Sequence, residues 1–201
     1  MIDLIFYILE SIGILSFALS GILIGKQKDY DLVGIFVLAC ATAFGGGTIR
    51  DIILDIQPVY WICHSEYPLI ILCMTIIMTY IYPIKVKNNW LFFPDSVGLA
   101  LFSITASKLA FSLGFPLIIV SILATISATF GGVIRDILCN EKPIIFQKNT
   151  SLYATVSFTG STLYVLLNIY TTLPEHFILI IAVLFTLIFR LISYKYKWKI
   201  K

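Results

Sequence analysis

Hydrophobic residues along the chain gather into seven long runs separated by short polar segments. Each run is close to the ~20 mostly apolar residues that a helix needs to cross the hydrocarbon core of a membrane. The runs cover about residues 4–24, 31–56, 67–83, 91–113, 116–141, 151–169 and 175–193. All seven prolines lie near the ends of runs, where a missing backbone N–H does little harm. The pattern predicts an all-α integral membrane protein with seven transmembrane helices.

The composition favours the same class. Hydrophobic residues make up 59% of the chain, charged residues 12%, and the mean hydropathy is +0.98. A soluble domain carries roughly twice that share of charge. No Lys or Arg precedes the first run, and no small-residue cleavage site follows it, so we read it as a retained span.

Candidate chemistry for an enzyme is missing from the sequence. It contains no HExxH and no GxSxG motif, and its cysteines form no CxxC pair. We therefore expect buried structural thiols, with no enzyme activity, no metal, no cofactor and no nucleic-acid partner. The four cysteines are Cys40, Cys63, Cys73 and Cys139.

Basic residues are distributed unevenly between the two sides of the predicted membrane. Eleven of the fourteen fall in alternate turns and in the C-terminal tail, on one side. They are Lys26, Lys28, Lys85, Lys87, Lys142, Lys148, Arg190, Lys195, Lys197, Lys199 and Lys201. The positive-inside rule makes that side cytoplasmic. We expect a multi-pass protein of the cell inner (plasma) membrane, with its N-terminus outside and its C-terminus in the cytoplasm. The basic tail is a membrane anchor or a contact for anionic lipids.

The chain repeats itself at an offset of 85 residues. Residues 10–58 align with residues 95–143 without a gap, and 14 of the 49 positions are identical. Each unit holds three spans, so its second copy enters the membrane from the opposite side. The sequence predicts an inverted 3+3 repeat plus one extra helix. The parts are residues 1–84, the first repeat; residues 85–170, the second; and residues 171–201, the seventh helix with its basic tail.

The most similar stretches of the two repeats are "GGGTIRD" and "GGVIRD". Glycine weakens a helix and favours a kink, which frees backbone carbonyls for a water-filled path. Close packing of helices is the alternative role for small residues. Because the glycines occur at mirrored depths, we expect functional kinks in helices 2 and 5. The motif glycines are Gly45, Gly46, Gly47, Gly131 and Gly132.

Each glycine run is followed by an Arg-Asp pair inside its span: Arg50 with Asp51, and Arg135 with Asp136. Either these charges reach the membrane interface, or each arginine turns inward to a carboxylate or to carbonyls freed at the other kink.

Further polar residues lie in the same spans. The repeat matches Glu10 with Asp95, although Asp95 also suits the first turn of a helix. Lys108 faces a cavity, a partner or the interface. Hydroxyl groups on spans 1, 4 and 5 point to a polar pathway between helices 1, 2, 4 and 5, with helices 3, 6 and 7 outside it. Candidate pathway residues are Glu10, Asp95, Lys108, Ser16, Ser20, Thr105 and Thr129.

Paired Gly-Gly-x-x-Arg-Asp motifs in a seven-span chain resemble the prokaryotic trimeric intracellular cation (TRIC) channels, a family also described as carrying two glycine-transporter-type domains. The resemblance covers about residues 2–192. It implies a homotrimer with one ion pathway inside each protomer, helices 2 and 5 kinked at the glycines, and permeation of monovalent cations, chiefly potassium. Gly45 aligns with Phe130 in the second repeat, so the role of Gly45 does not follow from the resemblance as directly as that of the other glycines.

Three functions remain open from the sequence. A potassium-type monovalent cation channel is the first. A secondary transporter of a small solute such as glycine is the second, since inverted repeats with broken helices also build alternating-access carriers. A structural or regulatory membrane protein is the third.

Overall fold

The computed structural model describes residues 2–81, 90–147 and 152–198. Five of the basic residues used for orientation lie outside the described residues: Lys85, Lys87, Lys148, Lys199 and Lys201. The boundary between the two repeats, expected at residues 84 and 85, also lies outside them.

Seven α-helices make up the described part of the chain, which contains no strand, and the predicted fold class is confirmed. They are α1 (Ile2–Gln27), α2 (Leu32–Ile53), α3 (Glu66–Ile76), α4 (Phe92–Ser112), α5 (Leu117–Leu138), α6 (Ala154–Tyr170) and α7 (Glu175–Lys195). A π-helical turn extends α3 over Ile77–Ile81. Short 3-10 turns follow α2 at Tyr60–Ile62 and α5 at Ile144–Phe146.

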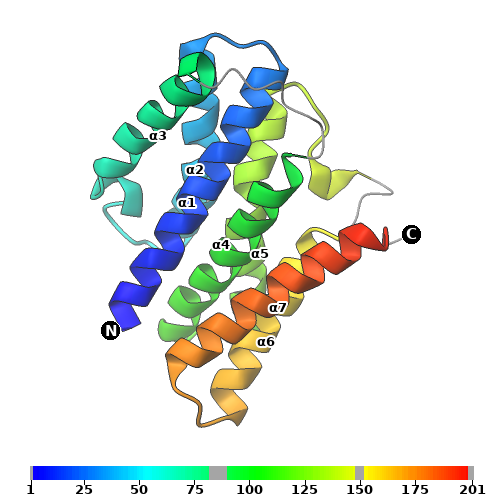
Figure 1. Cartoon of the computed structure of the whole chain (residues 1–201). Coiled ribbons are helices and arrows are strands. Elements are labelled where there is room, and N and C mark those ends of the chain that lie inside the picture. Colours follow the sequence, from blue (N-terminus) through cyan, green and yellow to red (C-terminus); the bar gives the residue numbers. More distant parts are fainter. Residues whose placement is uncertain (1, 82–89, 148–151, 199–201) are drawn as a thin grey trace.

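Corresponding helices of the two repeats run in opposite directions. In Figure 1, α1 rises from the N-terminus and α4 descends, while α2 descends and α5 rises. α1, α2, α4 and α5 pack on one another at the centre. α7 lies against α4 and α6.

The glycine motifs place the backbones of α2 and α5 in direct contact. A Cβ atom on Gly46 would lie 2.0 Å from the carbonyl oxygen of Ser127, and one on Gly131 would lie 2.4 Å from the carbonyl oxygen of Thr42. Ser127 is the repeat equivalent of Thr42, so the two contacts are related by the inverted symmetry. Both helices continue without interruption through their glycines, and the expected kinks are not confirmed. Close packing accounts for these glycines.

A second symmetric contact joins α1 to α4. A Cβ atom on Gly13 would lie 2.8 Å from the ring of Phe102, and one on Gly98 would lie 2.6 Å from the ring of Phe17. The two phenyl rings meet at a centroid distance of 5.3 Å. Each repeat therefore supplies one glycine and one phenylalanine, and the two rings pack against the two glycine backbones at the centre of the bundle.

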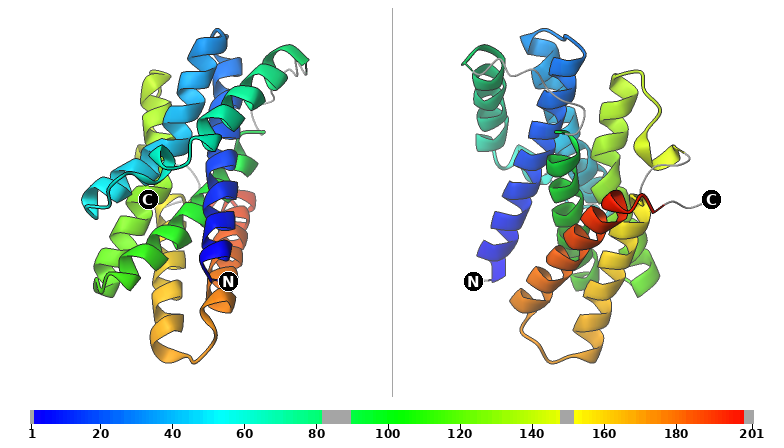
Figure 2. Two further views of the ribbon diagram at one scale, coloured as in Figure 1. Left: turned by 90° about the vertical axis from the view of Figure 1, so that its left-hand side faces the viewer. Right: turned by 45° about the vertical axis from the view of Figure 1, so that its right-hand side comes forward.

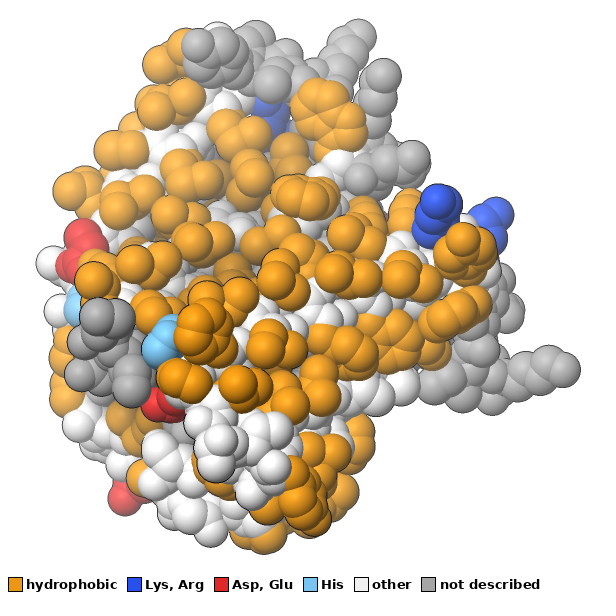
Figure 3. Space-filling model, turned by 60° about the horizontal axis from the view of Figure 1, so that its bottom comes forward, with side chains coloured by type: hydrophobic (Ala, Val, Ile, Leu, Met, Phe, Trp, Pro, Cys, Tyr) orange, Lys and Arg blue, Asp and Glu red, His pale blue; other side chains and the backbone are white. Residues whose placement is uncertain are grey.

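Four of the described helices are long and apolar enough to cross a membrane by themselves: α1, α2, α5 and α7. α4 is more polar, but 14 of its 21 residues are buried, so its polar groups face protein rather than lipid. Apolar side chains cover most of the face shown in Figure 3, and α7 exposes Phe177, Ile181 and Phe185. The protein is a multi-pass membrane protein.

The third helices of the two repeats differ. α6 packs against α4 and α5 through buried hydroxyls: Ser157 Oγ donates to Ser103 Oγ at 2.9 Å, and Ser107 Oγ donates to Ser161 Oγ at 2.7 Å. The first repeat has Ala18, Ile22, Leu72 and Ile76 at these four positions. α3 accordingly lies at one side of the bundle in the right-hand view of Figure 2. α6 shares the polar interior of the second repeat, whereas the sequence placed it outside.

We expect Gly46→Ala to destabilise the protein by about 1–3 kcal/mol, because the added methyl group meets a backbone carbonyl that cannot move alone. Gly45→Ala is the matched control, since its methyl group meets only the mobile end of the Ile134 side chain. The measurement is the apparent Tm in detergent. Equal Tm values for the two variants would contradict the α2–α5 contact.

Candidate functional site

Two buried ion clusters occupy equivalent places in the two repeats. In the first, Arg50 on α2 donates from Nη1 to Glu10 Oε1 of α1 at 2.9 Å and from Nε to Asp51 Oδ1 at 2.8 Å. All three side chains are at most 2% exposed. An arginine buried this deeply needs counter-charges, and two carboxylates provide them. We call these three residues the first cluster.

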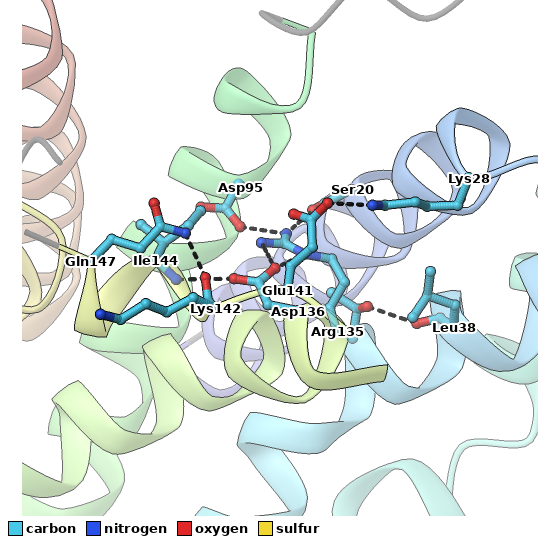
Figure 4. Close-up of polar contacts among 11 residues, drawn as sticks. Ser20, Lys28, Leu38, Asp95, Arg135, Asp136, Glu141, Lys142, Ile144 and Gln147 are labelled. Carbon is cyan, nitrogen blue, oxygen red and sulfur yellow. Dashed lines mark hydrogen bonds and ion pairs between the residues drawn. The ribbon is translucent and has the colours of Figure 1, made fainter. Parts of the chain in front are cut away.

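The second cluster consists of Asp95, Arg135 and Asp136 (Figure 4). Arg135 on α5 donates to Asp95 Oδ1 of α4 at 2.8 Å and to Asp136 Oδ1 at 2.9 Å. Its Nη1 also donates to Ser20 Oγ of α1 at 2.5 Å, which links the two repeats. Both arginines therefore turn inward to carboxylates.

The aspartates of the two motifs also fix the chain that follows each helix. Asp51 Oδ2 accepts from the backbone N–H of Tyr60, and Asp136 Oδ2 accepts from that of Ile144, both at 3.0 Å. The helices end alike, since Asp55 has a φ of 54° and Asn140 a φ of 55°. Asp and Asn tolerate this left-handed conformation better than most residues. Each motif thus determines how its helix packs and where the segment after the helix lies.

A narrow pocket opens beside the first cluster. Its lining residues are Glu10, Ile14, Ala43, Phe44, Gly47, Thr48, Arg50, Asp51, Tyr60, Trp61 and Phe102. Phe44 and Trp61 stack at a centroid distance of 4.9 Å. Burial, with a hydrogen bond to Tyr67, raises the pKa of the Tyr60 phenol, which therefore stays neutral at the pocket wall. Sequence reasoning missed the aromatic part of this wall, because Tyr60 and Trp61 lie in a connecting segment.

Arg190 lies near the second cluster, next to Tyr153, although the sequence assigned it to the basic cytoplasmic tail. It is 3% exposed, and its guanidinium lies over the rings of Tyr153 and Phe92 at 4.8 and 5.1 Å. Its Nη1 donates to the backbone carbonyl of Leu152 at 2.6 Å. Its position inside the apolar run of residues 175–193, rather than after it, is the signal that distinguishes it from the tail lysines.

The remaining candidates are dispersed around the clusters. Lys108 Nζ lies 3.7 Å from Glu175 Oε1 at the start of α7, so it has a carboxylate partner. Thr129 donates to the backbone carbonyl of Thr125, and Ser16 is half-buried on α1. Thr105, the repeat equivalent of Ser20, is buried, and its hydroxyl has no hydrogen-bond partner among the described residues. Of the hydroxyl candidates, only Ser20 contacts a motif arginine.

Together these features define a class: a helical membrane protein of two inverted three-helix repeats, each centred on a buried Gly-Gly-x-x-Arg-Asp motif. The family model described as "Glycine transporter" matches residues 7–83 and 92–168, which begin 85 residues apart. The UPF0126 membrane protein YvgT of Bacillus subtilis is 31% identical over 197 residues, 96% of this chain and 94% of the relative. The inner membrane protein YadS of Escherichia coli K12 shows the same identity and coverage.

Solved structures of cation channels have the same fold as this chain. A prokaryotic TRIC channel in 0.5 M KCl matches with a TM-score of 0.88 and 33% identity, covering 98% of this chain and 100% of the other. The trimeric intracellular cation channel orthologue from Rhodobacter sphaeroides matches with a TM-score of 0.88 and 28% identity, covering 96% and 99%. The chain belongs to the TRIC cation channel family.

We expect Arg50→Ala to destabilise the protein by ~3–5 kcal/mol, because it leaves two buried carboxylates without a positive counter-charge. Thermal unfolding of the purified protein measures the loss. Lys142→Ala is the control, since the Lys142 side chain is exposed. Lys26 is unsuitable because its ammonium donates to the backbone carbonyl of Met78. An Arg50→Ala variant that melts like the Lys142 control would show that the cluster contributes no stability.

Proposed function

We propose that the protein is a cation channel selective for monovalent cations of the potassium type. The observation that carries the proposal is the charge of the two motif clusters. Two carboxylates contact each motif arginine, so neither cluster carries a net positive charge. An unpaired arginine would repel a permeating cation, and the carboxylates neutralise that positive charge. Membership of the TRIC cation channel family supports the same function.

The proposed pathway lies inside one protomer, between α1, α2, α4 and α5. These helices carry both clusters at mirrored depths, and α1 and α4 carry hydroxyls that solvate cations. Direct contact between α2 and α5 limits the path at the glycines, so conduction requires this crossing to loosen. Gly46 and Gly131 would then form the crossing that opens, and Arg50 and Arg135 would hold the carboxylates beside the path.

A secondary transporter of a small solute such as glycine is the second candidate. The observation that favours it is the double match to the family model described as "Glycine transporter". Inverted repeats around a buried polar site also suit alternating access.

Planar-bilayer recording under a potassium gradient separates the two candidates. We expect unitary currents from the purified protein, because a channel passes many ions for each opening. Gly46→Leu and Gly131→Leu are expected to reduce the currents, with Lys142→Ala as the control. Saturable, counterflow-capable uptake without unitary currents would contradict the channel and favour the transporter.

We also propose a homotrimer, in keeping with the trimeric orthologue from Rhodobacter sphaeroides. Membrane lipids cover the apolar surface outside the trimer contacts. The mass of the detergent-solubilised complex tests the stoichiometry, and a monomer or dimer would contradict it.

The proposed orientation in the cell inner membrane places the N-terminus outside and the C-terminus in the cytoplasm. Lys28 and Glu141 form an ion pair, which brings the turns after α1 and α5 to the same end of the bundle. Single cysteines at positions 65 and 197 of a cysteine-free protein test the orientation. We expect an impermeant thiol reagent outside the cell to label position 65 alone. Labelling of position 197 alone would reverse the orientation.

A further inference from the structure

The two ion clusters are alike in geometry but differ in total charge. The Tyr153 hydroxyl lies near Arg135 and Asp95 of the second cluster, and Arg190 of α7 lies over the Tyr153 ring at 4.8 Å. Two carboxylates and two guanidinium groups therefore balance there. α7 has no equivalent in the first repeat. Of the described residues that line the pocket beside the first cluster, Arg50 is the only basic one, opposite Glu10 and Asp51. That pocket therefore carries one uncompensated negative charge.

The uncompensated charge lies on the Glu10 carboxylate, at the oxygen that has no partner among the described residues. Glu10 is 1% exposed, and its Oε1 accepts from Arg50. Its Oε2 is buried and has no hydrogen-bond partner among the described residues, although Glu10 lines the pocket. An unpaired buried carboxylate oxygen is costly unless a cation or a donor meets it. In the same cluster both oxygens of Asp51 are occupied, by Arg50 and by the Tyr60 N–H.

We propose that the pocket beside Glu10 binds a single weakly hydrated monovalent cation, of the size of potassium or ammonium. One positive charge neutralises the cluster, whereas a divalent cation would leave an excess beside the Arg50 guanidinium. The pocket wall includes Phe44, Trp61 and Phe102, and aromatic faces attract cations that lose their water easily. The site lies in the first repeat only, because Arg190 already supplies the balancing charge in the second.

The proposal rests on the proposed function and adds a defined binding site to it. Its position follows from the chain direction: α2 carries Arg50 in its last turn, at the end opposite the turn that holds Lys28. In the proposed orientation the site lies toward the outer surface. A permeating cation would thus pause near the outside of the pathway and meet a charge-balanced cluster near the cytoplasm.

The test uses Trp61 as the reporter. With Trp90→Phe and Trp198→Phe, Trp61 is the remaining tryptophan, and it lines the pocket. The purified protein is titrated with KCl while N-methyl-D-glucamine chloride keeps the ionic strength constant. We expect a saturable change in Trp61 fluorescence with potassium. Glu10→Gln, which keeps the shape and removes the charge, should raise the half-saturating concentration at least tenfold.

Glu141→Gln is the matched control, because it removes an exposed carboxylate at the end of the bundle away from the pocket. Its half-saturating potassium concentration should stay within about threefold of the parent. A parent protein whose Trp61 does not respond to potassium would overturn the proposal without any variant. So would a Glu10→Gln protein that titrates like the parent.

The outcome is separable from that of the proposed function. Unitary currents without a Trp61 response would remove the site and leave the channel. A saturable Trp61 response without unitary currents would keep the site and remove the channel.

Discussion

A guanidinium group buried within a membrane bundle must be matched by negative charge, and this constraint organises both repeats. Arg50 ties α2 to α1 through Glu10, and Arg135 ties α5 to α4 through Asp95. The neighbouring aspartates hold the chain where it leaves each helix. Since isolated buried charges are so costly, neither helix pair can separate without new partners for its charges. The ion clusters therefore hold α1 against α2 and α4 against α5. The glycines then allow α2 and α5 to pack closely.

Inverted symmetry governs the centre of the bundle, and asymmetry increases away from it. The Gly46 and Gly131 contacts and the two phenylalanine–glycine contacts repeat closely. The third helices differ, since buried serines bind α6 to α4, whereas apolar residues occupy the equivalent positions in the first repeat. α7 places Arg190 near the second cluster alone, over the Tyr153 ring. A symmetric frame thus carries two polar sites with different surroundings.

Much of this arrangement could be predicted from the sequence, because it depends on local pattern and on the repeat. Seven apolar runs predicted the helices, and the 85-residue offset paired Glu10 with Asp95. Contacts that depend on side-chain packing could not be predicted from the sequence in the same way. Glycine runs are compatible with both a kink and a close contact, and only three-dimensional packing shows that Gly46 meets Ser127. Arg190 was assigned to the basic tail because it lies at the end of the last apolar run, close to the tail lysines, and the sequence does not show which rings it meets.

Coupling between Glu10 and Arg50 tests the central claim most directly. A double-mutant cycle with Glu10→Met, Arg50→Met and the double variant, measured by SDS-induced unfolding in mixed micelles, isolates their interaction. The account predicts that the double variant loses less stability than the sum of the two single variants, by ~1.5–3 kcal/mol. Arg50→Met leaves Glu10 and Asp51 without a counter-charge, and the double variant removes the Glu10 charge from that site. Glu10→Met leaves Arg50 paired with Asp51. Losses that add to within ~0.5 kcal/mol would show that the two side chains do not form the buried pair on which the fold depends.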